Sequence, residues 1–136
     1  MHKVLWIMPN KSNRNSGIFK YNNELIKIKK KKTNLNVIYT GNNKLYFVTF
    51  FCKFIILPIY LIFNSFKFNT LILPEEGYAF LKLFSFTKKN VIIIHDYRKN
   101  FVLYNKVKIK ENFKQFYLNL NFLFINSYDS IIVPSK

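Results

Sequence analysis

The chain has 136 residues, half of them hydrophobic, which fits one domain with its own core, and three glycines and four prolines are too few for a linker or a disordered tail. Its single cysteine, Cys52, excludes an internal disulfide and predicts a reducing compartment. The formal net charge of +16 favours polyanionic partners such as anionic lipid, phosphate-bearing substrates or nucleic acid, or it reflects lysines that are only solvated.

Five short apolar segments, rich in β-branched residues, predict buried strands at 4–8, 36–40, 70–73, 91–94 and 130–133. Strands of this kind are covered on both faces, as in a parallel sheet, and longer segments with helical spacing lie between them. The pattern predicts an α/β fold in which a Rossmann-like, doubly wound parallel sheet forms the middle of three α/β/α layers. We expect the strand order 3-2-1-4-5.

The first helix is predicted to begin at Ser16 or Gly17, with the Ser16 hydroxyl as its N-cap. Its apolar face is predicted to comprise Ile18, Tyr21, Leu25 and Ile28. The helix ends in the run Lys27–Lys32, which either matches the negative end of the helix dipole or forms a phosphate or lipid patch.

Segment 45–66 is the most hydrophobic part of the chain, and Lys53 and Pro58 interrupt it. We expect one kinked helix or two helices broken near Leu57-Pro58, which pack on the sheet or lie in a membrane interface. A membrane-spanning helix is the less favoured alternative because of the central lysine.

Two further helices are predicted, a short one at 78–86 and an amphipathic one at 109–128. The apolar face of the second is predicted to comprise Ile109, Phe113, Phe116, Leu120 and Phe124.

Candidate functional residues follow the strands, because an open parallel sheet binds ligands beyond its carboxyl edge. Ser16 and Gly17 open a helix and offer an anion site, or form a plain capped start. His95 follows the fourth strand as a catalytic or a structural histidine. The acids Glu75 and Glu76 bind sugar hydroxyls, balance the charge of nearby lysines, or are solvated turn residues. The sequence has no phosphate-binding loop, no dinucleotide fingerprint and no Cys/His cluster with metal spacing.

The order of these motifs resembles the N-terminal half of the family 4 glycosyltransferases, which are retaining, metal-independent enzymes with two Rossmann-like domains. The resemblance is carried in chain order by KVLWIMP, SGIFKYNNEL, NVIYTG, FNTLILPEEGY, NVIIIHDYR and YDSIIVPSK. The family's first loop commonly reads Gly-Gly before a hydrophobic residue, and here Ser16 replaces the first glycine.

The resemblance implies a transferase that uses a nucleotide-sugar donor and a glycan or lipid-linked acceptor, with no metal or other cofactor. It implies that Ser16 and Gly17 approach the donor phosphate and that His95 is the catalytic residue beside the anomeric centre. The acceptor residues are assigned as Glu75, Glu76, Asp96 and Arg98. It also implies a cytoplasmic location with peripheral contact to the inner, anionic face of the cell membrane.

Residues 1–136 match only the acceptor-side domain of this family, because no second α/β domain and no acid pair at eight-residue spacing follow. We therefore expect the isolated chain to be an inactive fragment, or one that a partner chain completes with a donor domain. The alternative function is a non-enzymatic, basic, membrane-associated α/β protein. We expect no nucleic-acid partner, because no recognition motif accompanies the charge.

Overall fold

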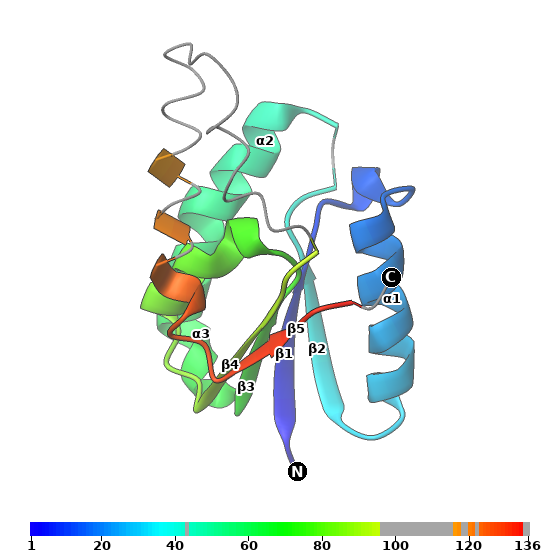
Figure 1. The fold of residues 1–136 in the computed structure, drawn as a ribbon, viewed down its shortest axis with the longest axis vertical. Coiled ribbons are helices and arrows are strands. Elements are labelled where there is room, and N and C mark those ends of the chain that lie inside the picture. Colours follow the sequence, from blue (N-terminus) through cyan, green and yellow to red (C-terminus); the bar gives the residue numbers. More distant parts are fainter. Residues whose placement is uncertain (43, 96–115, 118–119, 122, 135–136) are drawn as a thin grey trace.

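The computed structural model describes residues 1–42, 44–95, 116–117, 120–121 and 123–134. At its centre lies a five-stranded, all-parallel sheet (Figure 1). The strands are β1 (Lys3–Met8), β2 (Asn34–Tyr39), β3 (Thr70–Leu73), β4 (Lys89–Ile93) and β5 (Ser130–Ile132). All five predicted strands and the Rossmann-like three-layer architecture are confirmed.

The strand order is β2-β1-β3-β4-β5, so the expected order 3-2-1-4-5 is wrong. Burial along the strands gives the reason. Every residue of β3 is buried, as expected of a strand with neighbours on both sides, whereas no residue of the edge strand β2 is fully buried. Strand β3 therefore pairs with β1 through Leu5–Leu71 and Trp6–Ile72, and it separates β1 from β4.

Helices cover both faces of the sheet (Figure 1). Helix α1 (Gly17–Lys30) packs over Val4, Trp6 and Met8 of β1. The opposite face is covered by α3 (Leu57–Asn64) and the 3-10 helix η4 (Glu76–Phe84). Helix α2 (Tyr46–Phe51) and the π-helical turn η2 (Cys52–Ile56) precede α3 without a break, and the 3-10 helix η3 (Ser65–Lys67) follows it. A further 3-10 turn, η1 (Lys11–Asn13), precedes α1. The predicted short helix at 78–86 is thus present as η4, two residues earlier.

Helix α1 begins as predicted, because the Ser16 Oγ accepts a hydrogen bond from the Phe19 N–H at 3.1 Å. Its buried face differs from the prediction. The buried residues are Phe19, Asn22 and Ile26, while Ile28 is 63% exposed. The polar Asn22 can be buried on this face because its Oδ1 accepts a hydrogen bond from the Trp6 Nε1–H of β1. A prediction based on hydrophobic spacing alone does not detect such a pair.

Residues Tyr46–Lys67 form one continuous helical segment and not two helices broken near Pro58. The Leu57 N–H donates to the Cys52 carbonyl, so the helix widens by one residue just before the proline. A π-helical turn of this kind lets the chain bypass the hydrogen bond that Pro58 cannot donate. Leu57 and Leu61 of this segment are buried against the sheet.

The predicted helix at 109–128 falls partly outside the described residues, including Ile109 and Phe113. Of its predicted apolar face, Phe124 packs on the core, but Phe116 is 65% exposed and Leu120 is also exposed. The residues that are buried instead are Asn121 and Ile125. Asn121 is buried because its Oδ1 accepts the Phe80 N–H of η4 at 3.2 Å.

Candidate functional site

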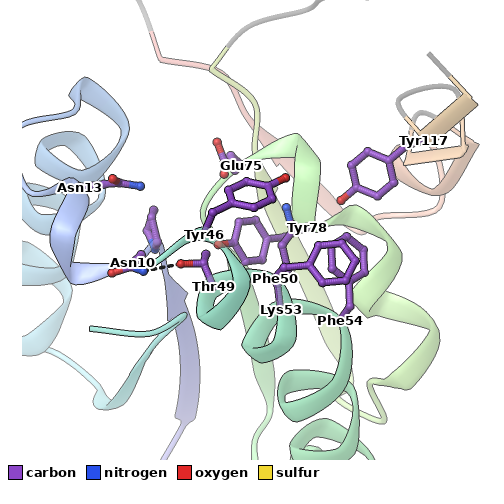
Figure 2. Close-up of a pocket in the computed structure, with 11 residues that line it drawn as sticks. Asn10, Asn13, Tyr46, Thr49, Phe50, Lys53, Phe54, Glu75, Tyr78 and Tyr117 are labelled. Atoms are coloured by element: carbon purple, nitrogen blue, oxygen red, sulfur yellow. Dashed lines mark hydrogen bonds between the residues drawn. The ribbon is translucent and has the colours of Figure 1, made fainter. Parts of the chain in front are cut away.

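With this strand order, the topological switch point of the sheet, where the strand order reverses, lies between β1 and β3. The chain leaves β1 for β2 on one side and returns to β3 on the other side, and ligands of doubly wound sheets bind at such a point beyond the carboxyl edge. A cavity of about 530 Å³ lies there (Figure 2). It is lined by Pro9, Asn10, Asn13, Tyr46, Thr49, Phe50, Lys53, Phe54, Glu75, Tyr78 and Tyr117. We call it the Lys53 pocket.

Lys53 is the cation of this pocket, and it projects from the π-helical turn η2. Its Nζ lies 4.2 Å from the ring centre of Tyr78 and 5.7 Å from those of Phe54 and Tyr117. Burial lowers the pKa of Lys53 to about 8, although Glu75 and Glu76 act in the opposite direction. The pocket therefore holds an amine that loses its proton far more readily than an exposed lysine.

The two acids after β3 have different surroundings. Glu75 lines the Lys53 pocket, where its charge favours the protonated form of Lys53. Glu76 accepts the His95 N–H through Oε2 at 3.4 Å, and burial raises its pKa above the usual value of a glutamate. The assignment of both acids to one acceptor site remains a prediction, and Glu75 is the acid that faces a cavity.

The opposite wall of the pocket is built from the loop after β1. The Asn10 Nδ2 donates to the Thr49 hydroxyl of α2 at 2.5 Å, and its Oδ1 accepts the Ser12 N–H at 2.9 Å (Figure 2). Gly41 has a φ of 103°, and a Cβ on it would lie 3.2 Å from the Asn10 Nδ2. This positive φ favours glycine and fixes how the two loops meet.

Tyrosine hydroxyls complete the polar lining. Tyr117 donates to the Gly77 carbonyl, which ties the C-terminal helical segment to η4. Burial raises the pKa of Tyr117 to about 12 and also raises the pKa of Tyr78. Both hydroxyls therefore stay protonated at neutral pH and can donate or accept hydrogen bonds.

His95 lies on the α1 side of the sheet and is partly buried. Its Nε2 is 3.1 Å from the Pro74 carbonyl, which can only accept, so Nε2 carries the proton and Nδ1 is left as an acceptor. The Tyr21 ring meets the imidazole edge-on at 5.3 Å between centres. Burial lowers the pKa of His95, which favours the neutral imidazole.

Asn22 holds the residues around His95 in place, and the sequence did not single it out. Its Oδ1 accepts the Trp6 Nε1–H at 3.0 Å. Its Nδ2 donates to the Ile18 carbonyl at 2.9 Å and to the Pro74 carbonyl at 3.2 Å. The Pro74 carbonyl oxygen therefore accepts hydrogen bonds from both the Asn22 and the His95 side chains. These bonds connect α1 to the ends of β3 and β4.

Ser16 and Gly17 open α1, one turn before the Tyr21 that contacts His95. The Ser16 hydroxyl already accepts the Phe19 N–H, so its role in capping is established and its role as a ligand is not. A Cβ on Gly17 would meet nothing within 4 Å, so the fold itself does not require glycine there. The predicted residues Asp96 and Arg98 lie outside the described residues.

Asn10, Lys53, Tyr78 and Tyr117 are candidate functional residues that sequence reasoning missed. Lys53 did carry a signal, because it is the one charged residue inside the apolar segment 45–66. Among the described residues, no three histidine, cysteine, aspartate or glutamate side chains gather where they could hold a metal ion.

A scan against protein-family models, a search of curated proteins and a search of solved structures found no match to this chain. The fold and the geometry at the carboxyl edge of the sheet are therefore the basis for a functional proposal.

Proposed function

We propose that this chain is the acceptor-side domain of a retaining glycosyltransferase that uses a nucleotide-sugar donor and a glycan or lipid-linked acceptor. The observation that supports the proposal best is the setting of His95. Its ring is fixed at the tip of β4 by the Pro74 carbonyl and the Tyr21 ring, beside the second turn of α1.

This setting suits a reaction at a sugar carbon. A neutral imidazole with a free Nδ1 can accept a hydrogen bond from a sugar hydroxyl and orient the ring without adding a positive charge. The N–H groups of Gly17 and Ile18 at the start of α1 have no partner within the helix, and the helix dipole favours a phosphate near them. Donor phosphate and reacting sugar would then lie on the α1 side of the edge.

The proposal is tested by sugar transfer in cells that express the complete reading frame containing this chain. His95→Ala should lower turnover about 100-fold, a typical loss when one transition-state hydrogen bond is removed. His2→Ala is the matched control, because His2 contacts Thr70 where β3 begins, at the opposite edge of the sheet. The product should keep the anomeric configuration of the donor, and a metal chelator should not reduce the rate. Equal turnover in both variants would refute the role of His95.

A second candidate function, a membrane-associated protein without enzymatic activity, is favoured by one surface. Nine apolar side chains of the 46–67 helix are between 41% and 76% exposed, and seven of them recur mostly at intervals of three or four residues. These seven are Phe47, Phe51, Ile55, Ile59, Ile62, Phe63 and Phe66, and we call them the apolar stripe. Exposed apolar patches of this size are uncommon on soluble monomers. By length and composition alone, the helix Tyr46–Lys67 is also long and apolar enough to cross a membrane.

We propose that this helix lies flat on an anionic membrane surface at the cytoplasmic face, and does not span the bilayer. Its other side is committed to the core through Leu57 and Leu61, which a spanning helix would have to expose to lipid. Exposed lysines at Lys44 and Lys67 bracket the stripe, and no acid occurs between Glu24 and Glu75. Anionic lipid therefore meets no repelling carboxylate along this segment.

Flotation with vesicles of equal parts phosphatidylglycerol and phosphatidylcholine tests this surface. Ile59→Glu should abolish binding, whereas Ile28→Glu, an equal change at an exposed residue of α1, should preserve it. If instead only Ile28→Glu weakens binding, the lysine run of α1 is the contact and the stripe is not. Vesicle binding together with a complete lack of sugar transfer by the full reading frame would favour this second function over the first.

A further inference from the structure

The Lys53 pocket combines a size and a lining that are typical of small-molecule sites. Its volume of about 530 Å³ lies within the range in which proteins bind small ligands. Among the described residues, five of the lining side chains are aromatic, namely Tyr46, Phe50, Phe54, Tyr78 and Tyr117. The pocket lies at the β1/β3 switch point, and part of its wall is the π-helical turn η2. Switch points and π-helical turns are both frequent at ligand-binding sites.

The polar groups of the pocket narrow the class of ligand. A charged lysine such as Lys53 can donate hydrogen bonds but cannot accept them. An ionised glutamate such as Glu75 can accept hydrogen bonds but cannot donate them. Asn13 and Thr49 can do both (Figure 2). A carboxylate or phosphate would need donors on all sides and would be repelled by Glu75, and a cation would be repelled by Lys53. Hydroxyl groups, which donate and accept, match the mixed lining.

The aromatic rings narrow the class further. The face of an aromatic ring is electron-rich, so it attracts groups that carry partial positive charge. The C–H groups on the flat side of a sugar ring are of this kind. Tyr46 lines the pocket and is 82% exposed, whereas the Phe54 ring is stacked on the Phe80 ring at 5.0 Å between centres. The Tyr46 ring is therefore available to a ligand, while the Phe54 ring is held by packing.

We infer that the Lys53 pocket binds an uncharged, hydroxyl-rich ring of the pyranose type, with Lys53 and Glu75 holding hydroxyl groups and the tyrosine rings covering its apolar face. The binding itself follows from the pocket. Its use as the acceptor site rests on the proposed transferase function, and it moves the acceptor from the His95 side of the sheet to the α2 side.

The ionisation of Lys53 supplies an internal readout of the site. Because burial lowers its pKa to about 8, the amine changes charge in a range that is easy to study. A hydroxyl that accepts from the ammonium stabilises the charged form, so bound ligand raises the pKa of Lys53. Affinity should therefore be highest below pH 8 and should fall as the pH rises above it. Sugar bound elsewhere on the surface would lack this dependence.

Amide NMR titration of the 136-residue chain with methyl glucosides, methyl galactosides and methyl mannosides tests the inference. At least one of these neutral sugars should shift pocket amides such as those of Thr49 and Tyr78, and glucuronate should bind more weakly than the matching methyl glucoside. Tyr46→Ala, at an exposed position that does not affect the fold, should weaken binding at least tenfold. Lys53→Met should weaken binding similarly and remove its pH dependence.

Lys82→Met is the matched control, since Lys82 also lies over a tyrosine ring, that of Tyr128 at 5.3 Å, but outside the pocket. The inference is overturned if no neutral sugar shifts the pocket amides at concentrations of tens of millimolar, if glucuronate binds more tightly, or if Tyr46→Ala binds as well as wild type. Sugar binding without transfer by the full reading frame would refute the proposed function and keep this inference. If Tyr46→Ala transfers sugar as fast as wild type, the transferase function is kept and the pocket is not its acceptor site.

Discussion

Lys53 makes the stability of the fold depend on pH in a direction that can be stated in advance. Its pKa falls from 10.5 in an unfolded chain to about 8 in the fold, mainly because burial penalises the ammonium. Between these two values the unfolded chain binds more protons than the folded protein, so the free energy of unfolding rises with pH. Below pH 8 both states are protonated and the dependence disappears.

The size of the effect follows from the same two values. The full difference between 10.5 and about 8 corresponds to about 3 kcal/mol. Only part of this free energy is gained between pH 7 and pH 9, where we expect the free energy of unfolding to rise by about 1 kcal/mol. Above pH 10 the trend should reverse, because burial raises the pKa of Tyr117 to about 12 and the unfolded chain then loses its tyrosine protons first.

Urea unfolding of wild type and Lys53→Met at pH 7, 8 and 9 measures this contribution. Wild type should gain about 0.5 M in its midpoint over this range relative to the variant, in which the titrating group is absent. Lys82→Met removes a charge from the same side of the sheet and should keep the wild-type slope. Parallel pH profiles for wild type and Lys53→Met would show that Lys53 titrates as an exposed lysine, and the description of the pocket would then be wrong.

Two further predictions concern the residues that shape the carboxyl edge. Asn22→Ala should lower the free energy of unfolding by about 3 kcal/mol, because it removes three hydrogen bonds and leaves the buried Trp6 N–H without its acceptor. Asn23→Ala on the same helix should change it little in urea unfolding, and equal effects would contradict the role given to Asn22. Gly41→Ala should cost about 1–2 kcal/mol in thermal unfolding because of its positive φ, whereas Gly17→Ala should be tolerated, since a Cβ there meets nothing within 4 Å. A Gly41→Ala protein as stable as Gly17→Ala would refute that account.

The fold class could be predicted from the sequence because the residues within a strand indicate whether one or both of its faces are buried. The run TLIL at 70–73 carries three consecutive apolar residues after Thr70, a pattern typical of a strand that is covered on both faces, and all four residues are buried. The order of the strands could not be predicted in the same way. It depends on which strand occupies the middle, and the partly exposed residues of β2 become informative only when its neighbours are known.

The candidate site was predictable only where a residue follows a strand directly. His95 follows β4 and was found, but Lys53 reaches the same edge from the middle of a long apolar helix. Its sequence signal, a lone lysine in segment 45–66, was interpreted only as an obstacle to membrane insertion. Asn22 had no signal, because its three hydrogen bonds are made to residues 4, 16 and 52 positions away.

The three residues after β3 join the two parts of the carboxyl edge. The Pro74 carbonyl holds the His95 ring on the α1 side, Glu75 lines the Lys53 pocket on the α2 side, and Glu76 accepts the His95 N–H. A change in the charge of Lys53 acts on both glutamates, because they are the acids that bear on its pKa. A ligand in the pocket can therefore influence the surroundings of His95 through Glu76 without touching the histidine. For the proposed transferase, this coupling predicts that acceptor binding in the Lys53 pocket changes the surroundings of the His95 ring across the end of β3.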